Sequence, residues 1–312
     1  MSRVHDALKR AEQSTMVETR IVPPPADAVP PLDQVLPPAG ADTALSLGGV
    51  LQQIQEVPFD PAPEAHLLDA TKPQDAPTEE FRAFRTRLNH MQSLQPLHTV
   101  VVTSPSPAEG KSFSAVNFAL AEAHLAGNLT LLADFDFRRP VVHHLFQIER
   151  SPGATEYLQG KAPLSAVIKK ISGSNLYVMP AGEAVINPLE LLNLRGVKEL
   201  LDELPKLFNW VILDSPPLLF AADANLVSTL CDGTILVVRV GVTTIDSVTR
   251  AMSSLCENNV LGCLVNGAER RELYSKYAYY HSYYYYSPTG VDTHAESEPD
   301  AEDAAAPPSG TP

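Results

Sequence analysis

The sequence has few basic residues, few cysteines and no long apolar run. It contains 23 Lys and Arg against 37 Asp and Glu, with no basic block. Non-specific binding of nucleic acid depends on many Lys and Arg contacts to phosphates, so no nucleic-acid partner is expected. The three cysteines form no C-x-x-C pair and cannot all pair in disulfides. This cysteine usage fits a reducing compartment.

Two kinds of targeting segment are also missing from the sequence. No run reaches the ~18 apolar residues that are needed to span a bilayer. Residues 1–12 lack the apolar stretch of a signal peptide. A soluble, cytoplasmic protein is therefore expected.

The acidic charge lies at the two ends of the chain. The formal net charge is −14 over 312 residues. Residues 1–76 carry 5 basic and 11 acidic side chains, and residues 287–312 carry six acidic side chains and no basic one. Residues 77–286 are nearly balanced, with 18 basic and 20 acidic side chains. About 210 balanced residues suffice for one sizeable core or two small ones.

Composition divides the chain into three parts. Residues 1–77 are predicted to hold a short N-terminal helix from Ser2, either fraying or docking to a partner, and a linker that contains 12 of the 28 prolines. A further short helix fits Gly49–Val57. Residues 78–268 are predicted to form the folded domain. Residues 269–312 hold eight of the ten tyrosines but few aliphatic side chains, so a flexible tail is expected there.

Strand-like and helical patterns alternate after an amphipathic helix that begins at Thr78. Six apolar runs are predicted as strands: His98–Thr103, Leu129–Asp134, Asn175–Met179, Trp210–Asp214, Thr234–Val240 and Val260–Val265. Four stretches between them are predicted as helices: Ser112–Ala126, Pro188–Leu204, Ala221–Leu230 and Ile245–Asn258. Continuously apolar strands are typical of a parallel sheet that is buried on both faces. The sequence therefore predicts a three-layer, doubly wound α/β domain, in which ligands bind at the carboxyl ends of the strands.

The first core strand leads through Ser104–Glu109 into Gly110-Lys111-Ser112 and a helix. This order of strand, loop and helix is typical of a phosphate loop, whose backbone N–H groups face the phosphates. Lys111 would neutralise the β- and γ-phosphate oxygens, and the Ser112 hydroxyl would bind Mg²⁺. The strict motif has glycine where Pro105 stands, so an ordinary loop remains the alternative.

Two other strand ends carry carboxylates. Asp134 and Asp136 follow one apolar strand, and Asp214 ends another. Paired acids beside a phosphate loop favour metal binding and general-base chemistry, and an acid after four apolar residues is the second signature of nucleotide sites. Arg138 and Arg139 either position phosphates or pair with surface acids. Each signal is weak alone, but three such strand ends in one domain support each other.

These segments together resemble the bacterial tyrosine autokinases of capsule and exopolysaccharide synthesis, over about Thr78 to Tyr286. Ser104–Ser112 is similar to the family's Walker A segment, Leu131–Pro140 to its Walker A′ and Val211–Pro217 to its Walker B. The chain departs from the family pattern at Ala108, usually glycine, at Phe113, often threonine, and at Asn209, usually aspartate. An alanine at position 108 tolerates a positive φ poorly.

Two further segments carry the resemblance outside the nucleotide site. Glu79-x-x-Arg82-x-x-Arg85 is similar to the family's ring-assembly motif. The tail resembles the family's C-terminal tyrosine cluster, which implies these phosphoacceptors: Tyr274, Tyr277, Tyr279, Tyr280, Tyr283, Tyr284, Tyr285 and Tyr286. Residues 2–12 resemble the start of stand-alone autokinases.

The resemblance implies a P-loop NTPase fold of the deviant-Walker, partition ATPase-like type that binds ATP and Mg²⁺. The implied nucleotide-binding residues are Ala108, Glu109, Gly110, Lys111, Ser112 and Phe113. The implied Mg²⁺ ligands are Ser112, Asp136 and Asp214. The implied catalytic residues are Lys111, Asp134, Asp136 and Asp214, with a weak preference for Asp134 as the base.

The implied partners are further copies of the chain in a ring, a separate membrane polysaccharide co-polymerase as activator, and a tyrosine phosphatase. The kinase would be cytoplasmic and recruited to the inner face of the cell membrane. Two other functions stay open. A partition- or division-site-type ATPase shares the fold but carries a second lysine early in the loop, where Ser104–Glu109 has none. A non-catalytic, nucleotide-dependent scaffold would use the tail only as an aromatic interaction surface.

Overall fold

The computed structural model describes residues 47–61, 67–68, 78–193, 195–255 and 260–268. The chain divides into two compact units, Met1–Gln52 and Gln53–Pro312. The described part of the first unit belongs to helix α2 (Leu47–Gln53). The predicted helix from Ser2, most of the proline-rich segment and the tyrosine cluster lie outside the described residues.

A sheet of eight strands lies at the centre of the second unit, in the order β1-β4-β5-β3-β6-β2-β7-β8 among the described residues. The strands are β1 (Gln55–Val57), β2 (Thr99–Thr103), β3 (Thr130–Asp134), β4 (Lys169–Ile171), β5 (Leu176–Met179), β6 (Trp210–Asp214), β7 (Gly233–Arg239) and β8 (Val260–Asn266). Neighbouring strands are parallel except β4 and β5. The predicted mainly parallel, doubly wound sheet is confirmed.

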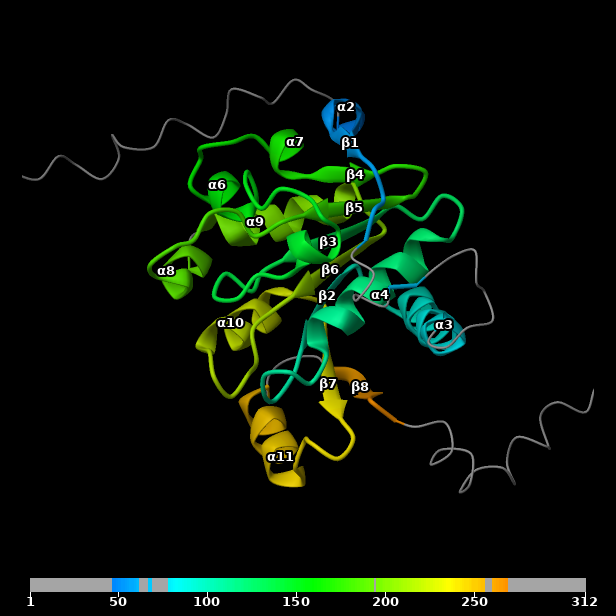
Figure 1. Ribbon diagram of the computed structural model, residues 1–312, viewed down its shortest axis with the longest axis vertical. Coiled ribbons are helices and arrows are strands. Elements are labelled where there is room, and N and C mark those ends of the chain that lie inside the picture. Colours follow the sequence, from blue (N-terminus) through cyan, green and yellow to red (C-terminus); the bar gives the residue numbers. More distant parts are fainter. Residues whose placement is uncertain (1–46, 62–66, 69–77, 194, 256–259, 269–312) are drawn as a thin grey trace, which may run out of the picture. The chain divides into compact units, whose positions relative to one another are not determined.

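Helices cover both faces of this sheet (Figure 1). On one face lie α3 (Thr78–Leu94) and α4 (Lys111–Ala123), and on the other α8 (Pro188–Leu192), α9 (Arg195–Glu203), α10 (Ala222–Leu230) and α11 (Ile245–Ser254). The shorter elements are α5 (Val142–Leu145), α6 (Ala154–Leu158), α7 (Leu164–Val167) and η3 (Leu204–Lys206). Ile235 and Val237 of β7 share a cluster with α4, while Leu236 packs with Ala224 and Ala251 of α10 and α11. This alternation along one strand produces the three layers.

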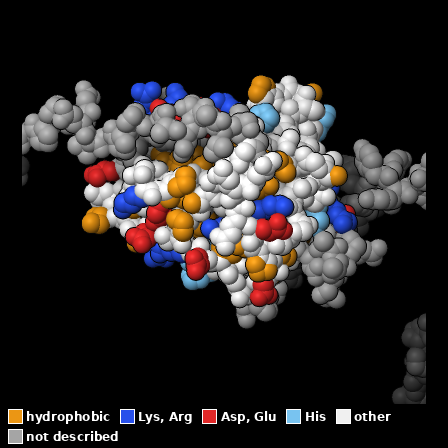
Figure 2. Space-filling view, turned by 90° about the horizontal axis from the view of Figure 1, so that it is seen from above, with side chains coloured by type: hydrophobic (Ala, Val, Ile, Leu, Met, Phe, Trp, Pro, Cys, Tyr) orange, Lys and Arg blue, Asp and Glu red, His pale blue; other side chains and the backbone are white. Residues whose placement is uncertain are grey.

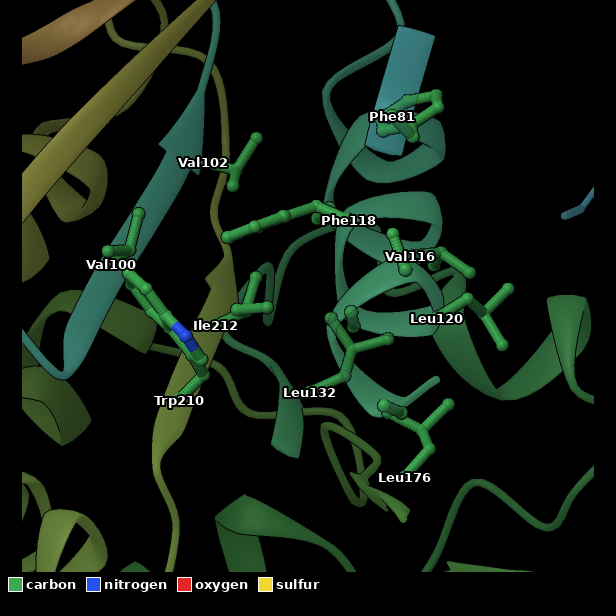
Figure 3. Packing of buried hydrophobic residues seen from close by; sticks show 14 of the residues in the cluster. Phe81, Val100, Val102, Val116, Phe118, Leu120, Leu132, Leu176, Trp210 and Ile212 are labelled. Atoms are coloured by element: carbon green, nitrogen blue, oxygen red, sulfur yellow. The ribbon is translucent and has the colours of Figure 1, made fainter. Parts of the chain in front are cut away.

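Aromatic side chains fix α4 against the sheet. Phe118 reaches from α4 toward the strands, where its ring centroid lies 5.6 Å from that of Trp210 on β6 (Figure 3). Phe84 of α3 packs against the other side, with ring centroids 5.1 Å apart. Phe118 and Trp210 are fully buried. Because α4 begins at Lys111, this packing also positions the end of the loop that precedes it.

The structure differs from the sequence prediction at the edges of the sheet and in one helix. Strands β1 and β4 were not predicted, and β1 lies within the range that was assigned to the linker. The short helix expected over Gly49–Val57 is only partly right, because α2 ends at Gln53 and residues 55–57 form β1. Each of the two strands has only three residues, too few to give a periodic pattern, and two of the three are polar. The polar residues of β1 are exposed, and those of β4 are half-buried. The single helix predicted over Pro188–Leu204 is wrong, because the chain forms α8 and then α9. Asn193 ends α8 by donating from Nδ2 to the Leu189 carbonyl (3.0 Å).

The surface of the described domain has charges of both signs. Figure 2 shows one face on which Lys and Arg side chains are interspersed with Asp and Glu. This distribution agrees with the balanced charge of residues 77–286. Within the described ranges, no helix combines the length and the apolar character needed to cross a bilayer.

A buried carboxylate joins α3 to α4 near the end of α4 that is remote from Lys111. Glu122 is fully buried, and its Oε2 accepts hydrogen bonds from Asn89 Nδ2 (3.1 Å) and Asn128 Nδ2 (2.8 Å). Asn89 Oδ1 in turn accepts from Trp210 Nε1 (3.0 Å). Burial raises the pKa of Glu122 to about 7, although the two asparagines and the Arg85 charge oppose the shift.

Replacing Glu122→Gln is expected to remove a pH dependence of folding stability. A carboxyl whose pKa rises on folding takes up a proton, so the wild type loses stability as the pH rises from about 4.5 to about 7. The wild type should lose at most about 3 kcal/mol of unfolding free energy through this titration, at ~1.4 kcal/mol per pKa unit. Urea unfolding of the wild type and Glu122→Gln at pH 5 and pH 8 measures this loss. An equal difference between the two proteins at both pH values would contradict this assignment.

Candidate nucleotide site

The carboxyl ends of β2, β3 and β6 bring the predicted site residues together. Asp134 and Asp214 are partners in the register of β3 and β6. Lys111 Nζ lies 2.8 Å from Asp136 Oδ2 and 3.6 Å from Asp214 Oδ1. The same ammonium donates a hydrogen bond to Ser112 Oγ (3.2 Å). Four side chains from the three sequence motifs therefore form one cluster, which we call the acidic-lysine cluster: Lys111, Ser112, Asp136 and Asp214.

Lys111 keeps its positive charge in this setting. Burial lowers the pKa of the ammonium, while the charges of Asp214 and Asp136 raise it more, so the net shift is upward. A largely buried, permanently charged ammonium at the start of α4 is suited to phosphate oxygens.

Asp214 is the acid of the cluster with the fewest partners. It is fully buried, and its polar neighbours are Ser112 and Lys111, whose ammonium lies 3.6 Å from Asp214 Oδ1. No hydrogen bond of 3.5 Å or shorter reaches either carboxylate oxygen from the described residues. Burial raises the pKa of Asp214, and the nearby charge of Lys111 opposes this shift. A buried carboxylate with free lone pairs, close to a serine hydroxyl, fits a hard divalent cation such as Mg²⁺. Mg²⁺ is commonly held by one or two carboxylates together with substrate phosphates, so a larger cluster of protein ligands is not required.

Asp134 has a different environment from Asp214. Its Oδ1 accepts from Asp136 N, and its Oδ2 accepts from Val141 N and Val142 N, each at 3.1 Å. Burial, followed by repulsion from Asp214, raises the pKa of Asp134 well above its ordinary range. These three bonds hold the turn between β3 and α5, and so position Asp136.

Two residues of the phosphate loop have a left-handed backbone conformation. Gly110 has φ +96° and precedes α4, and a Cβ there would overlap the side-chain amide of Asn266. Ala108 has φ +63°. A non-glycine residue in this region costs of order 1 kcal/mol or more. The chain therefore takes the loop conformation that glycine favours in spite of the alanine.

Comparison with known proteins identifies the family. The chain is 32% identical over 219 residues to the tyrosine-protein kinase YwqD of Bacillus subtilis (strain 168), covering 70% of this chain and 92% of that protein. The chain belongs to the bacterial tyrosine-protein kinase family. No family model matches this kinase.

Other relatives agree with this assignment. The kinase is 32% identical over 206 residues to the tyrosine-protein kinase etk of Escherichia coli (strain K12), covering 65% of this chain but 28% of that larger protein. It superposes on the kinase domain of E. coli ETK with a TM-score of 0.62 and 28% identity, covering 72% of this chain and 82% of that structure. The resemblance seen in the sequence motifs is confirmed.

Phe113 and Arg138 turn toward partners in the kinase's own chain. The Phe113 ring packs against Phe81, with centroids 6.1 Å apart, so only its backbone could face a nucleotide. Arg138 makes a two-pronged ion pair with Asp223, from Nε to Oδ2 (2.6 Å) and from Nη2 to Oδ1 (3.2 Å). This finding favours the interpretation that Arg138 pairs with an acid.

The three residues of the ring-assembly motif differ in their surroundings. Glu79 and Arg82 form an ion pair of 2.6 Å on the surface of α3. Arg85 is half-buried and donates from Nη1 to the Ala121 carbonyl (2.8 Å). Glu79 and Arg82 thus face outward, whereas Arg85 joins α3 to α4 within the chain.

The sequence motifs did not reveal three residues of the C-terminal part of the domain that contact the phosphate loop. These are Arg239 at the end of β7, Thr243 before α11, and Asn266 at the end of β8. They lie more than 120 positions after the loop and belong to none of the motifs. Arg239 and Asn266 give a signal, since each is a polar residue that ends an apolar strand.

Proposed function

We propose that this chain is an ATP-dependent protein-tyrosine autokinase that uses Mg²⁺ and phosphorylates the tyrosine cluster at its C-terminal end. The observation that carries the proposal is the acidic-lysine cluster beside a phosphate loop, in a member of the bacterial tyrosine-protein kinase family. The relatives bear the name of tyrosine-protein kinases, and the tail of this chain offers eight tyrosines.

The backbone of residues 108–113 and the Lys111 ammonium would hold the ATP phosphates. Ser112, Asp136 and Asp214 would hold Mg²⁺, which supplies charge neutralisation at the phosphate oxygens when bound. Asp214 fits this role because it is buried beside Ser112 and Lys111 and no backbone N–H occupies either of its oxygens. Asp136 would have to exchange its contact with Lys111 for the cation, which leaves the ammonium for the phosphates.

In the reaction, the tyrosine oxygen forms a bond to the γ-phosphorus, and the bond from that phosphorus to the bridging oxygen of ADP breaks. The phenolic proton passes to a carboxylate, because a tyrosine with a pKa of about 10 is a weak nucleophile at neutral pH. The sequence interpretation preferred Asp134 as the base. We keep Asp134 for this role, because Asp136 is assigned to Mg²⁺ and Asp134 is the carboxylate of this pair that the cation leaves free. Asp134 also accepts three backbone hydrogen bonds, which hold it in place beside Asp214.

The phosphoacceptors would belong to a neighbouring copy of the chain. Each phosphate adds about −1.5 to −2 charges, so eight would add roughly −12 to −16. That is close to the chain's own net charge of −14. We therefore propose that rings form through Glu79 and Arg82 when the tail is unmodified, and separate when it is phosphorylated. The regulated process would be capsule or exopolysaccharide synthesis, with a membrane co-polymerase recruiting the kinase to the membrane and a phosphatase resetting it.

A mixing experiment tests the transfer between chains. One protein carries Lys111→Met and an intact tail, and the other carries an intact site and phenylalanine at all eight tail positions. After incubation with MgATP, mass spectrometry should find phosphate within residues 274–286 of the Lys111→Met protein only when both proteins are present. Sedimentation velocity of the wild type before and after ATP should show a shift to smaller assemblies.

Other outcomes would assign another function. ATP hydrolysis with no phosphotyrosine in the wild type would favour a partition-type ATPase. Nucleotide binding with neither activity, even with a membrane partner added, would favour the scaffold. Equal assembly sizes before and after phosphorylation would contradict the proposed cycle while leaving the kinase activity intact.

A further inference from the structure

The phosphate loop is bonded on its outer side to two segments from the C-terminal part of the domain. Arg239 Nη1 donates to the carbonyl oxygen of Ala108 (3.1 Å), and Asn266 Nδ2 donates to that of Glu109 (3.0 Å). Thr243 Oγ1 donates to Glu109 Oε1 (2.6 Å). We call Arg239, Thr243 and Asn266 the loop brace.

The hydrogen bonds within the brace fix the direction of its side chains. Thr243 Oγ1 accepts from Arg239 N (2.8 Å), so its hydroxyl proton is free to point at Glu109. Asn266 Oδ1 accepts from Gly267 N (2.8 Å), which orients the amide nitrogen toward the loop. Glu109 is buried, and its second oxygen accepts from Ser106 N (2.7 Å). The hydroxyl of Thr243 and the amide of Asn266 are therefore each held in one orientation, with the donor group toward the loop.

Peptide planarity gives these bonds a consequence for the inner side of the loop. In a trans peptide the carbonyl and the following N–H point in opposite directions. Holding the carbonyls of Ala108 and Glu109 outward therefore turns the N–H groups of Glu109 and Gly110 away from the brace. These are N–H groups of the loop that cradles phosphates in this motif.

The brace also acts where the loop is strained. Ala108 has φ +63°, a left-handed conformation that its Cβ makes unfavourable. The bond from Arg239 is made to the carbonyl of that same residue. Removing the brace would let Ala108 relax toward negative φ and rotate the adjoining peptides.

We propose that Arg239, Thr243 and Asn266 are positioning residues for nucleotide binding, which aim the Glu109 and Gly110 N–H groups at the phosphates. This inference rests on the proposed function, because it presupposes a nucleotide at the loop. It assigns a part in phosphate binding to the β7–α11 connection and to the end of β8.

The first test is the affinity of Thr243→Val for MgADP, measured by isothermal titration calorimetry. The variant leaves a buried Glu109 oxygen without its donor. The Kd is expected to rise about tenfold, which corresponds to ~1.4 kcal/mol. Thr249→Val is the matched control, since Thr249 Oγ1 bonds only the Ile245 carbonyl on exposed α11, and its Kd should stay within about twofold of the wild type.

Rescue separates positioning from general destabilisation. Adding Ala108→Gly to Thr243→Val should restore the Kd to within about threefold of the wild type, because glycine adopts positive φ without strain. In steady-state kinetics, KM for ATP should rise with kcat little changed. A merely structural role of Thr243 would lower the melting temperature without rescue by glycine. Arg239→Gln alters an exposed side chain and should fold, and its Kd should rise about three- to fivefold.

The outcomes distinguish this inference from the proposed function. If the wild type binds MgADP while Thr243→Val and Arg239→Gln bind it equally well, the brace plays no part and the inference is overturned, whereas the nucleotide site stands. If the wild type binds no nucleotide, both fail. Weakened binding without rescue by Ala108→Gly overturns the positioning role.

Discussion

Replacing Lys111→Met is expected to lower the rate of tyrosine phosphorylation at least about 100-fold, the scale of losing one preorganised charged donor. The ammonium lies between Asp136 and Asp214 at the start of α4, where the proposed phosphates would sit. Its raised pKa keeps it charged at neutral pH. The initial rate of phosphate transfer from labelled ATP measures the effect.

A matched variant shows whether the effect belongs to the site. Lys170→Met removes a half-buried lysine of β4 that pairs with Glu56 at 3.4 Å, outside the nucleotide site, and it should leave the rate unchanged. Retention of more than a tenth of the wild-type rate by Lys111→Met would contradict the proposed role. Lys111→Met also leaves the buried carboxylates without their cation, so circular dichroism must show that the variant is folded.

The centre of the fold could be predicted because its strands are buried on both faces. Trp210–Asp214 matches its predicted range, and the other central strands shift by one residue at most. Periodicity carries no such information for β1 and β4, which have three residues each, two of them polar. The break between α8 and α9 depends on one asparagine cap within an otherwise helical pattern.

The inner part of the site could also be predicted, since each motif follows a strand of a parallel sheet. Lys111, Asp136 and Asp214 meet for that reason. The different environments of Asp134 and Asp214 could not be predicted, because they depend on which backbone N–H groups the turn presents. The loop brace could not be predicted either, since Thr243 comes close to Glu109 only because β7 pairs with β2 in the folded sheet.

Replacing Asp214→Asn is expected to change activity and stability in opposite directions. Activity should fall at least about 100-fold, because an amide is a poor substitute for a carboxylate in holding the cation that assists transfer. The free energy of unfolding should rise by about 1–3 kcal/mol, because the cost of burying this carboxylate exceeds what its 3.6 Å ion pair with Lys111 returns. Lys111 keeps its bond of 2.8 Å to Asp136 in the variant.

The gain in stability should depend on pH in a defined direction. Since folding raises the pKa of Asp214, the wild type loses stability as the pH rises from the unfolded to the folded pKa. The advantage of the asparagine should therefore grow with pH and shrink in acid, where the carboxyl is protonated in both states. Urea unfolding at about pH 3.5 and pH 8, without nucleotide or Mg²⁺, measures this difference, since the unfolded pKa of an aspartate is about 3.9.

Asp232→Asn is the contrasting control. Asp232 Oδ2 accepts from His98 N, Thr99 N and Thr99 Oγ1 at 2.8 to 2.9 Å, so its charge is satisfied. Losing a charge that accepts several hydrogen bonds should lower the free energy of unfolding. A similar decrease in the unfolding free energy of Asp214→Asn would mean that Asp214 stabilises the free protein. That result would contradict the proposal that its carboxylate serves to bind a cation. A gain at position 214 beside a loss at position 232 would show that the Asp214 carboxylate lowers the stability of the free protein, as expected of a residue that serves the proposed reaction and not the fold.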